Sequence, residues 1–132
     1  MLNTLERTLK IEVVEDDKAT AYFLKKKLSR NIEGCKIIER DRPEYLFPDL
    51  GFEKPMIIIL DWFFPGYNSL HLIPRLSKYK GLVCIFSNED SSNIRKAIVR
   101  ELGEVPKNVR IFNKFNYEGM ELEIVDYIAD NF

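Results

Sequence analysis

The sequence predicts an α/β fold, in which a doubly wound sheet of five parallel strands carries helices on both faces. Five short apolar segments alternate with segments of helical periodicity along the 132 residues. The stretches between the apolar segments are too long for hairpins, so successive strands should run parallel and connect through right-handed crossovers. The length is that of one ordinary domain. We therefore expect a single domain over residues 1–132, with its core at about 9–131.

The five apolar segments are the expected strands. The first alternates and then becomes continuously apolar, and the second is rich in β-branched residues. The third and fourth are uninterrupted apolar runs, which are typical of strands covered on both faces. In chain order the segments are 9–14, 35–38, 56–60, 82–86 and 109–112. We expect them to form one sheet in the flavodoxin-like order 2-1-3-4-5.

Four helices are expected between or after these strands. Polar residues suited to capping precede two of them, namely Asn68 or Ser69 and then Ser91 or Ser92. Pro74 should kink or shorten the helix that it occupies. Each segment carries apolar residues at helical spacing, and the segments are 18–30, 69–76, 93–102 and 119–131.

The segment 42–55 is the least regular part of the chain. It contains Pro43, Pro48, Gly51 and Pro55. At most one short helix fits there, around residues 44–47.

Composition and charge exclude several classes of protein. The chain has 20 Lys and Arg against 21 Asp and Glu, which argues against a nucleic-acid binder that relies on bulk charge. Two cysteines and one histidine argue against a disulfide scaffold and a histidine-based metal site. The longest apolar run is far too short to cross a bilayer, and no secretory signal is recognisable. We expect a soluble cytoplasmic domain that contacts neither nucleic acid directly nor membranes.

Polar side chains stand where the expected strands end. Glu15 and Asp16 follow the first strand, Asp61 follows the third, Ser87 follows the fourth and Lys114 comes after the fifth. The carboxyl ends of parallel strands meet at one edge of a sheet, where such folds bind ligands. Clustered carboxylates raise one another's pKa unless a cation sits among them, and oxygen ligands suit Mg²⁺. With a lysine and a hydroxyl nearby, the site would stabilise a phosphoryl group during transfer onto Asp61.

This arrangement resembles the receiver domain of two-component response regulators. The resemblance covers nearly the whole chain, from about residue 9 to residue 128. It rests on four short motifs that occur in the family's order and at suitable spacing. They are VVEDD at 13–17, IIILD at 57–61 with Pro65 beyond it, IFS at 85–87 and FNK at 112–114.

The resemblance implies a magnesium site. Asp16 and Asp61 would bind Mg²⁺ directly, and Glu15 would bind it directly or through water. The backbone carbonyl of Phe63 would be the remaining protein ligand. Mg²⁺ is therefore the cofactor that we expect.

The resemblance also implies a signalling role. Asp61 would accept a phosphoryl group from a phosphohistidine on a sensor histidine kinase or a histidine phosphotransfer protein. Ser87 and Lys114 would hold the phosphoryl oxygens, and movement of Ser87 with the following loop would signal to a downstream protein partner. Such a domain is not an enzyme in the usual sense, because it catalyses only its own phosphoryl transfer and slow autodephosphorylation. The sequence leaves open whether the chain forms a homodimer.

Several positions depart from the family's pattern. Ser69 stands where a glycine is usual, Asn88 where a small residue is usual, and Ile111 in the place of the switch aromatic. Phe115 replaces the proline after the lysine, and extra residues lie at 103–108. These departures are compatible with phosphorylation chemistry but put the usual hydroxyl–aromatic switch in question. They motivate an alternative, a degenerate receiver that acts as a phosphorylation-independent protein-interaction module.

Two further alternatives fit the fold class less well. A flavodoxin-like redox carrier would place a phosphate loop after the first strand, where the carboxylates of Glu15, Asp16 and Asp17 would repel a flavin phosphate. A phosphatase with an aspartate nucleophile would carry an acid where Phe63 stands.

The sequence suggests specific behaviour for some residues near the site. We expect Asp17 to cap the first helix rather than bind metal. Phe63 should shield an acyl phosphate on Asp61 from water. Tyr22 and Phe23 fall off the inward stripe of the first helix. With Phe115 they either form an apolar docking patch for a four-helix phosphodonor or pack locally.

One residue breaks the apolar pattern of its strand. Glu12 lies inside the first strand, which we place centrally in the sheet. Either the burial of this position is misjudged or Glu12 pairs with Lys36 on the neighbouring strand.

Overall fold

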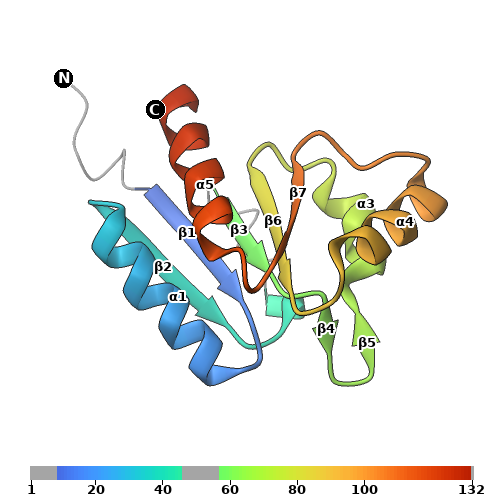
Figure 1. The fold of residues 1–132 in the computed structure, drawn as a ribbon, viewed down its shortest axis with the longest axis horizontal. Coiled ribbons are helices and arrows are strands. Elements are labelled where there is room, and N and C mark those ends of the chain that lie inside the picture. The colour runs from blue at the N-terminus through green and yellow to red at the C-terminus, as the bar shows by residue number, and fades with distance from the viewer. Residues whose placement is uncertain (1–8, 46–56, 132) are drawn as a thin grey trace.

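A computed structural model describes residues 9–45 and 57–131 of the chain. Within them, five parallel strands form one sheet in the order β2-β1-β3-β6-β7, which confirms the predicted 2-1-3-4-5 topology (Figure 1). Met56 and residues 46–47 of the expected short helix lie outside the described residues. The strands are β1 (Leu9–Val14), β2 (Cys35–Arg40), β3 (Ile57–Leu60), β6 (Leu82–Ser87) and β7 (Val109–Asn113).

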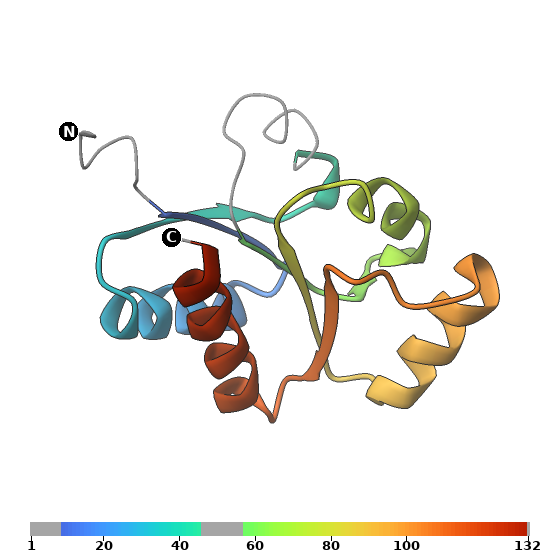
Figure 2. The ribbon, with the colours of Figure 1, turned by 90° about the horizontal axis from the view of Figure 1, so that it is seen from above.

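Helices cover both faces of the sheet. Figure 2 shows α1 (Lys18–Asn31) and α5 (Tyr117–Asn131) together on one face. The short helices η3 (Ser69–Leu72) and α3 (Ile73–Leu76) lie on the other face with α4 (Ser91–Leu102). Because side chains alternate along a strand, β3 sends Ile58 and Leu60 into the core beneath α3 and α4, and Ile57 and Ile59 into the core beneath α1 and α5.

Local chemistry sets where the helices begin and end. The Asp17 carboxylate accepts a hydrogen bond from the backbone N–H of Thr20 at 3.2 Å, so Asp17 caps α1 as expected. Pro74 shortens its helix to four residues, as expected. The expectation that Ser91 or Ser92 caps α4 is wrong, because the Asp90 carboxylate accepts from the Ser92 N–H at 2.9 Å.

A small hairpin after the third strand was not predicted. Strands β4 (Phe63–Phe64) and β5 (Tyr67–Asn68) pair antiparallel. Gly66 has a φ of +85°, a conformation that only glycine adopts easily, and it permits the tight turn between them. The Tyr67 hydroxyl donates to the Glu44 carboxylate at 2.7 Å, which attaches the hairpin to the 3₁₀ helix η2 (Pro43–Tyr45).

Glu12 is fully buried, and the prediction that it pairs with Lys36 is wrong. The Glu12 carboxylate pairs with the Arg40 guanidinium, with Nε 3.1 Å from Oε1. Lys36 lies opposite Lys10 in the parallel register and is exposed, whereas Arg40 ends the same neighbouring strand. Arg40 can reach back along the sheet because its side chain is long and carries a planar cation.

Hydrogen bonds hold the extra residues at 103–108 against the rest of the fold. Gly103 ends α4 in a left-handed conformation, with a φ of +87°. The Asn108 side-chain amide donates to the carbonyls of Leu76, Tyr79 and Gly81 at 2.9, 3.0 and 3.2 Å. This segment is therefore part of the packed structure beside α3 and β6. In the described ranges, no helix is both long and apolar enough to cross a bilayer.

Candidate functional site

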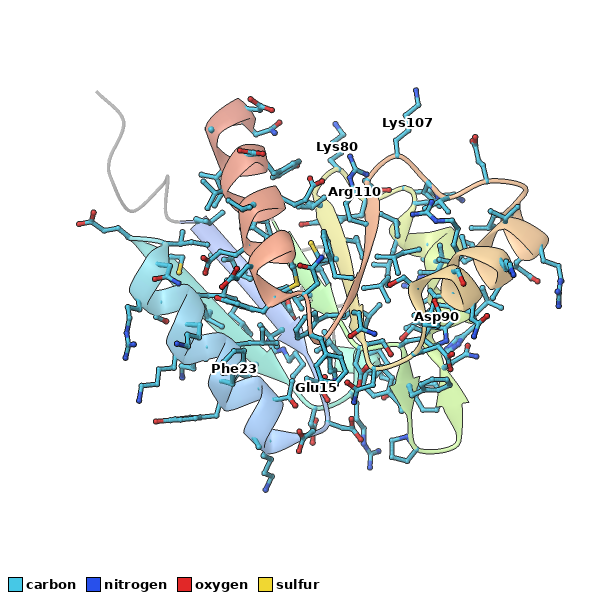
Figure 3. All side chains as sticks on the ribbon, viewed as in Figure 1. Glu15, Phe23, Lys80, Asp90, Lys107 and Arg110 are labelled. Atoms are coloured by element: carbon cyan, nitrogen blue, oxygen red, sulfur yellow. The ribbon has the colours of Figure 1, made fainter. Side chains whose placement is uncertain are left out.

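Three carboxylates meet at the edge where the strands end. Carboxylate oxygens of Glu15, Asp16 and Asp61 all lie within 4.8 Å of one another. The sheet itself places these residues, because the Asp61 N–H donates to the Val14 carbonyl at 3.0 Å and so joins β3 to β1. Figure 3 shows Glu15 at this edge and Lys80, Lys107 and Arg110 at the opposite end of the sheet.

Lys114 supplies the cation that faces these acids. Its ammonium lies 3.0 Å from a Glu15 carboxylate oxygen and 3.6 Å from an Asp61 carboxylate oxygen. The backbone N–H of Lys114 donates to the Ser87 carbonyl at 2.9 Å, which fixes the start of this side chain beyond β7. Four side chains predicted from three strand ends, Glu15, Asp16, Asp61 and Lys114, therefore come together in space.

Burial governs the protonation of the cluster. Burial, with the Asp61 carboxylate beside it, raises the pKa of Glu15 to about 7 despite the opposing effect of Lys114. Burial also raises the pKa of Asp61, and Lys114 opposes that shift. For Lys114, burial lowers the pKa, but its hydrogen bond to Glu15 and the charge of Asp61 outweigh burial and raise it. The site concentrates negative charge that one lysine does not fully balance.

The donor set fits a divalent cation. The available groups are hard carboxylate oxygens, the ligands that Mg²⁺ prefers. Glu15 and Asp61 are buried, whereas Asp16 is exposed and leaves the site open to solvent on one side. A cation among them would counteract the two causes that raise the pKa of Glu15, which are burial and the neighbouring Asp61 carboxylate.

Ser87 and Phe63 flank the cluster. Ser87 is buried at the end of β6, opposite Asn113 of β7, and its hydroxyl oxygen accepts from the Glu89 N–H at 3.2 Å. It therefore lies at the same edge as the acids. Phe63 begins β4, two residues beyond Asp61, and 49% of its surface is exposed.

Two partners of Asp61 were not assigned a role from the sequence. The Trp62 N–H donates to the Asp61 carboxylate at 2.8 Å. The Ser69 hydroxyl donates to the Asp61 backbone carbonyl at 2.6 Å, and the Ser69 N–H donates to the Trp62 carbonyl at 2.8 Å. The only signal in the sequence was that Ser69 stands in the place of a glycine.

The other departures lie around the site. Ile111 is partly buried and packs in the core between the sheet and α4, and Asn88 is exposed. Phe115 is 92% exposed directly after Lys114. Of the two aromatic residues on α1, Phe23 packs edge-on against Tyr117 at 5.3 Å between ring centres, whereas Tyr22 is 64% exposed.

Comparison with solved structures identifies the fold. No protein-family model and no curated protein sequence matches the chain. Solved structures do match, including the signal receiver domain of a DNA-binding response regulator from Colwellia psychrerythraea 34H, with 22% identity over 92% of this chain and 98% of that chain and a TM-score of 0.75. A response regulator from Thermotoga maritima matches with 22% identity over 94% and 99% of the two chains, at a TM-score of 0.69. The signal receiver domain of a putative response regulator from Mycobacterium tuberculosis matches with 15% identity over 95% of this chain and 98% of that chain, at a TM-score of 0.71. The chain therefore has the fold of response-regulator receiver domains.

Proposed function

We propose that this chain is a phosphoacceptor domain of a two-component or phosphorelay system, and that it accepts a phosphoryl group on Asp61. One observation carries the proposal. The Asp61 carboxylate, which is only 7% exposed, lies between acidic neighbours suited to a divalent cation and an ammonium group 3.6 Å away. Titratable groups whose pKa values are shifted, gathered at the ligand-binding edge of a parallel sheet, are typical of a functional site.

The carboxylate of Asp61 is the nucleophile in this proposal. One oxygen accepts the Trp62 N–H and the other faces Lys114, so the carboxylate is held in one orientation. A carboxylate oxygen attacks phosphorus and forms an acyl phosphate. The bond between phosphorus and the imidazole nitrogen of the donor breaks, and its electron pair stays on the imidazole.

The neighbouring residues balance the charge of the transferred group. Lys114 pairs with a phosphoryl oxygen, and the Ser87 hydroxyl turns from the Glu89 N–H to donate to another. Asp16, Asp61 and Glu15 would hold Mg²⁺ together with the Phe63 carbonyl. The ion, when bound, would neutralise the negative charge that develops on the phosphoryl oxygens.

The proposed partners follow from this chemistry. The donor is a phosphohistidine on a sensor histidine kinase or a histidine phosphotransfer protein, and the output is contact with a downstream protein. We place the chain in the cytoplasm. Because Ile111 is aliphatic and partly buried, the output should depend on Ser87 and the following loop rather than on an aromatic switch.

Beryllium fluoride tests the proposal because it binds an aspartate carboxylate as a phosphoryl mimic. Trp62 is the only tryptophan and its backbone contacts Asp61, so its fluorescence reports on the site. We expect a fluorescence change that requires both beryllium fluoride and Mg²⁺ and that Asp61→Asn abolishes. Asp41→Asn is the control, because Asp41 is an exposed aspartate that follows β2 at the same edge. No Mg²⁺-dependent change in the wild-type protein would favour the phosphorylation-independent interaction module instead.

A further inference from the structure

Exposed apolar side chains gather on one face of the molecule. Seven large apolar residues are exposed among the described residues, and five of them belong to α1, to α5 or to the turn before α5. A concentration of this kind on a soluble domain marks an interaction surface. The five are Tyr22, Phe23, Phe115, Leu122 and Val125, with exposed fractions of 64, 41, 92, 65 and 44%.

The charges of the same two helices are completely segregated. Helix α1 carries five cationic side chains and no acidic one, whereas α5 carries five acidic side chains and no cationic one. The near-neutral net charge of the chain conceals this separation. The cations are Lys18, Lys25, Lys26, Lys27 and Arg30, and the acids are Glu118, Glu121, Glu123, Asp126 and Asp130.

The two helices lie side by side and run in the same direction, since each connects or follows parallel strands (Figures 1 and 2). The Asn31 amide of α1 donates to the Glu121 carboxylate of α5 at 2.7 Å. Phe23 of α1 also contacts Tyr117, the first residue of α5, edge-on. The face is therefore one continuous surface with a basic half and an acidic half.

Little of this charge is matched within the fold. Among the described residues, no cation of α1 forms an ion pair, and the only acid of α5 that does so is Glu123, which pairs with Arg110 at 3.9 Å. Lys26 and Lys27 instead lie over the rings of Tyr22 and Phe23, 5.9 and 6.0 Å from the ring centres. The outward charges are free to be complemented by another molecule.

We propose that the face formed by α1 and α5 binds a second copy of this chain. A two-fold axis that runs along the helices, between α1 and α5, places α1 of one copy on α5 of the other, twice over. Both contacts then join a basic helix to an acidic one, as a self-complementary interface requires. A two-fold axis across the helices would instead place α1 on α1 and α5 on α5, with like charges opposed.

Each of the two helices carries an exposed outer row of side chains. Tyr22, Lys26 and Arg30 follow at intervals of four residues, so they form one exposed row on α1. Leu122, Asp126 and Asp130 form an exposed row on α5, which continues past the end of α1 because Asn31 lies beside Glu121. Each row begins with an apolar residue and ends with two charges of one sign. The dimer does not depend on phosphorylation of Asp61.

Charge reversal followed by mixing tests the arrangement. Lys26→Glu/Arg30→Glu makes the exposed row of α1 acidic, and Asp126→Lys/Asp130→Lys makes the exposed row of α5 basic. By sedimentation velocity we expect the wild-type protein to dimerise and each reversed protein alone to dimerise at least about tenfold more weakly. A mixture of the two reversed proteins should form heterodimers, because both contacts then again join opposite charges. The wild-type dimer should also weaken as salt is added.

The matched control reverses two cations on the other face. Arg95→Glu/Lys96→Glu changes α4 by the same charge and should leave dimerisation unchanged, and circular dichroism should show all variants folded. A monomeric wild-type protein, or a dimer that both reversals leave intact, would overturn the proposal. If the monomeric protein instead loses phosphotransfer from a four-helix phosphodonor when α1 is reversed, the face belongs to that donor and not to a second copy.

Discussion

The Ser69 hydroxyl donates a 2.6 Å hydrogen bond to the backbone carbonyl of Asp61, eight residues earlier. Ser69 is completely buried, and its own N–H holds the Trp62 carbonyl. Ser69, which stands in the place of a glycine, therefore fixes the backbone of Asp61, the proposed phosphoacceptor.

Removal of this hydroxyl should weaken both the fold and the site. Ser69→Ala leaves a buried carbonyl without its donor, which typically costs about 1–3 kcal/mol. We expect that loss in urea unfolding, together with slower Mg²⁺-dependent phosphorylation. Ser77→Ala is the matched control, because the Ser77 hydroxyl makes a 2.7 Å bond to the Pro74 carbonyl on an exposed surface. Equal losses in the two variants would show that the Ser69 bond has no special role.

Phe63 should slow hydrolysis of the acyl phosphate. Its ring stands two residues beyond Asp61 and is half exposed, where it can keep water from the phosphoryl group. Phe63→Asn should shorten the half-life of the phosphorylated protein several-fold, because the amide admits and orients water. The half-life is measured after removal of the phosphodonor, with Val99→Asn on α4 as an exposed apolar control. An unchanged half-life in Phe63→Asn would rule out the shield.

Binding of Mg²⁺ should depend on pH through Glu15. The carboxylate must lose its proton to bind a cation, and its pKa of about 7 means that protons compete below that pH. Trp62 fluorescence should therefore report weaker Mg²⁺ binding at pH 6 than at pH 8. Glu15→Gln should flatten the dependence between these values. If wild-type affinity is the same at both pH values, Glu15 is not titrating beside the metal.

Glu15 should also make the stability of the metal-free protein depend on pH. The pKa of Glu15 in the folded protein lies above its ordinary value of 4.5, so the folded state binds more protons between about pH 4.5 and 7. The free energy of unfolding contributed by Glu15 should fall as the pH rises through this window. Added Mg²⁺ should restore more stability at pH 8 than at pH 5.

Arg40 should stabilise the core through Glu12. The carboxylate of Glu12 is fully buried in the central part of the sheet and accepts from Arg40 Nε at 3.1 Å. Arg40→Met removes this cation and should cost about 3 kcal/mol in urea unfolding, the low end for a broken buried ion pair because the Arg40 side chain is 32% exposed. Glu12→Leu/Arg40→Met should recover much of the loss. A double variant as unstable as Arg40→Met would contradict this account.

The sequence predicted the sheet well because each strand has a strong local signal. Strand β1 has the predicted bounds, and the ends of the central strands converge as the parallel topology requires. Glu15, Asp16, Asp61 and Lys114 therefore meet although they are distant in the chain. Topology alone was enough to predict their proximity.

The missed features depend on contacts that periodicity does not encode. The β4–β5 hairpin has two residues in each strand, too few for an alternating pattern. The choice between Lys36 and Arg40 as the partner of Glu12 depends on how far each side chain reaches across the sheet. Several polar residues precede α4, and only the backbone geometry selects Asp90 as its cap.

Phosphorylation of Asp61 tests the central claim most directly. The wild-type protein is incubated with acetyl phosphate and Mg²⁺, and intact-mass spectrometry counts the phosphoryl groups that it gains. We predict one phosphoryl group that alkali and hydroxylamine remove, that requires Mg²⁺ and that is absent from Asp61→Asn, while Asp41→Asn gains it normally. A wild-type protein that gains none, or an Asp61→Asn protein that gains the same group at the same rate, would contradict the account.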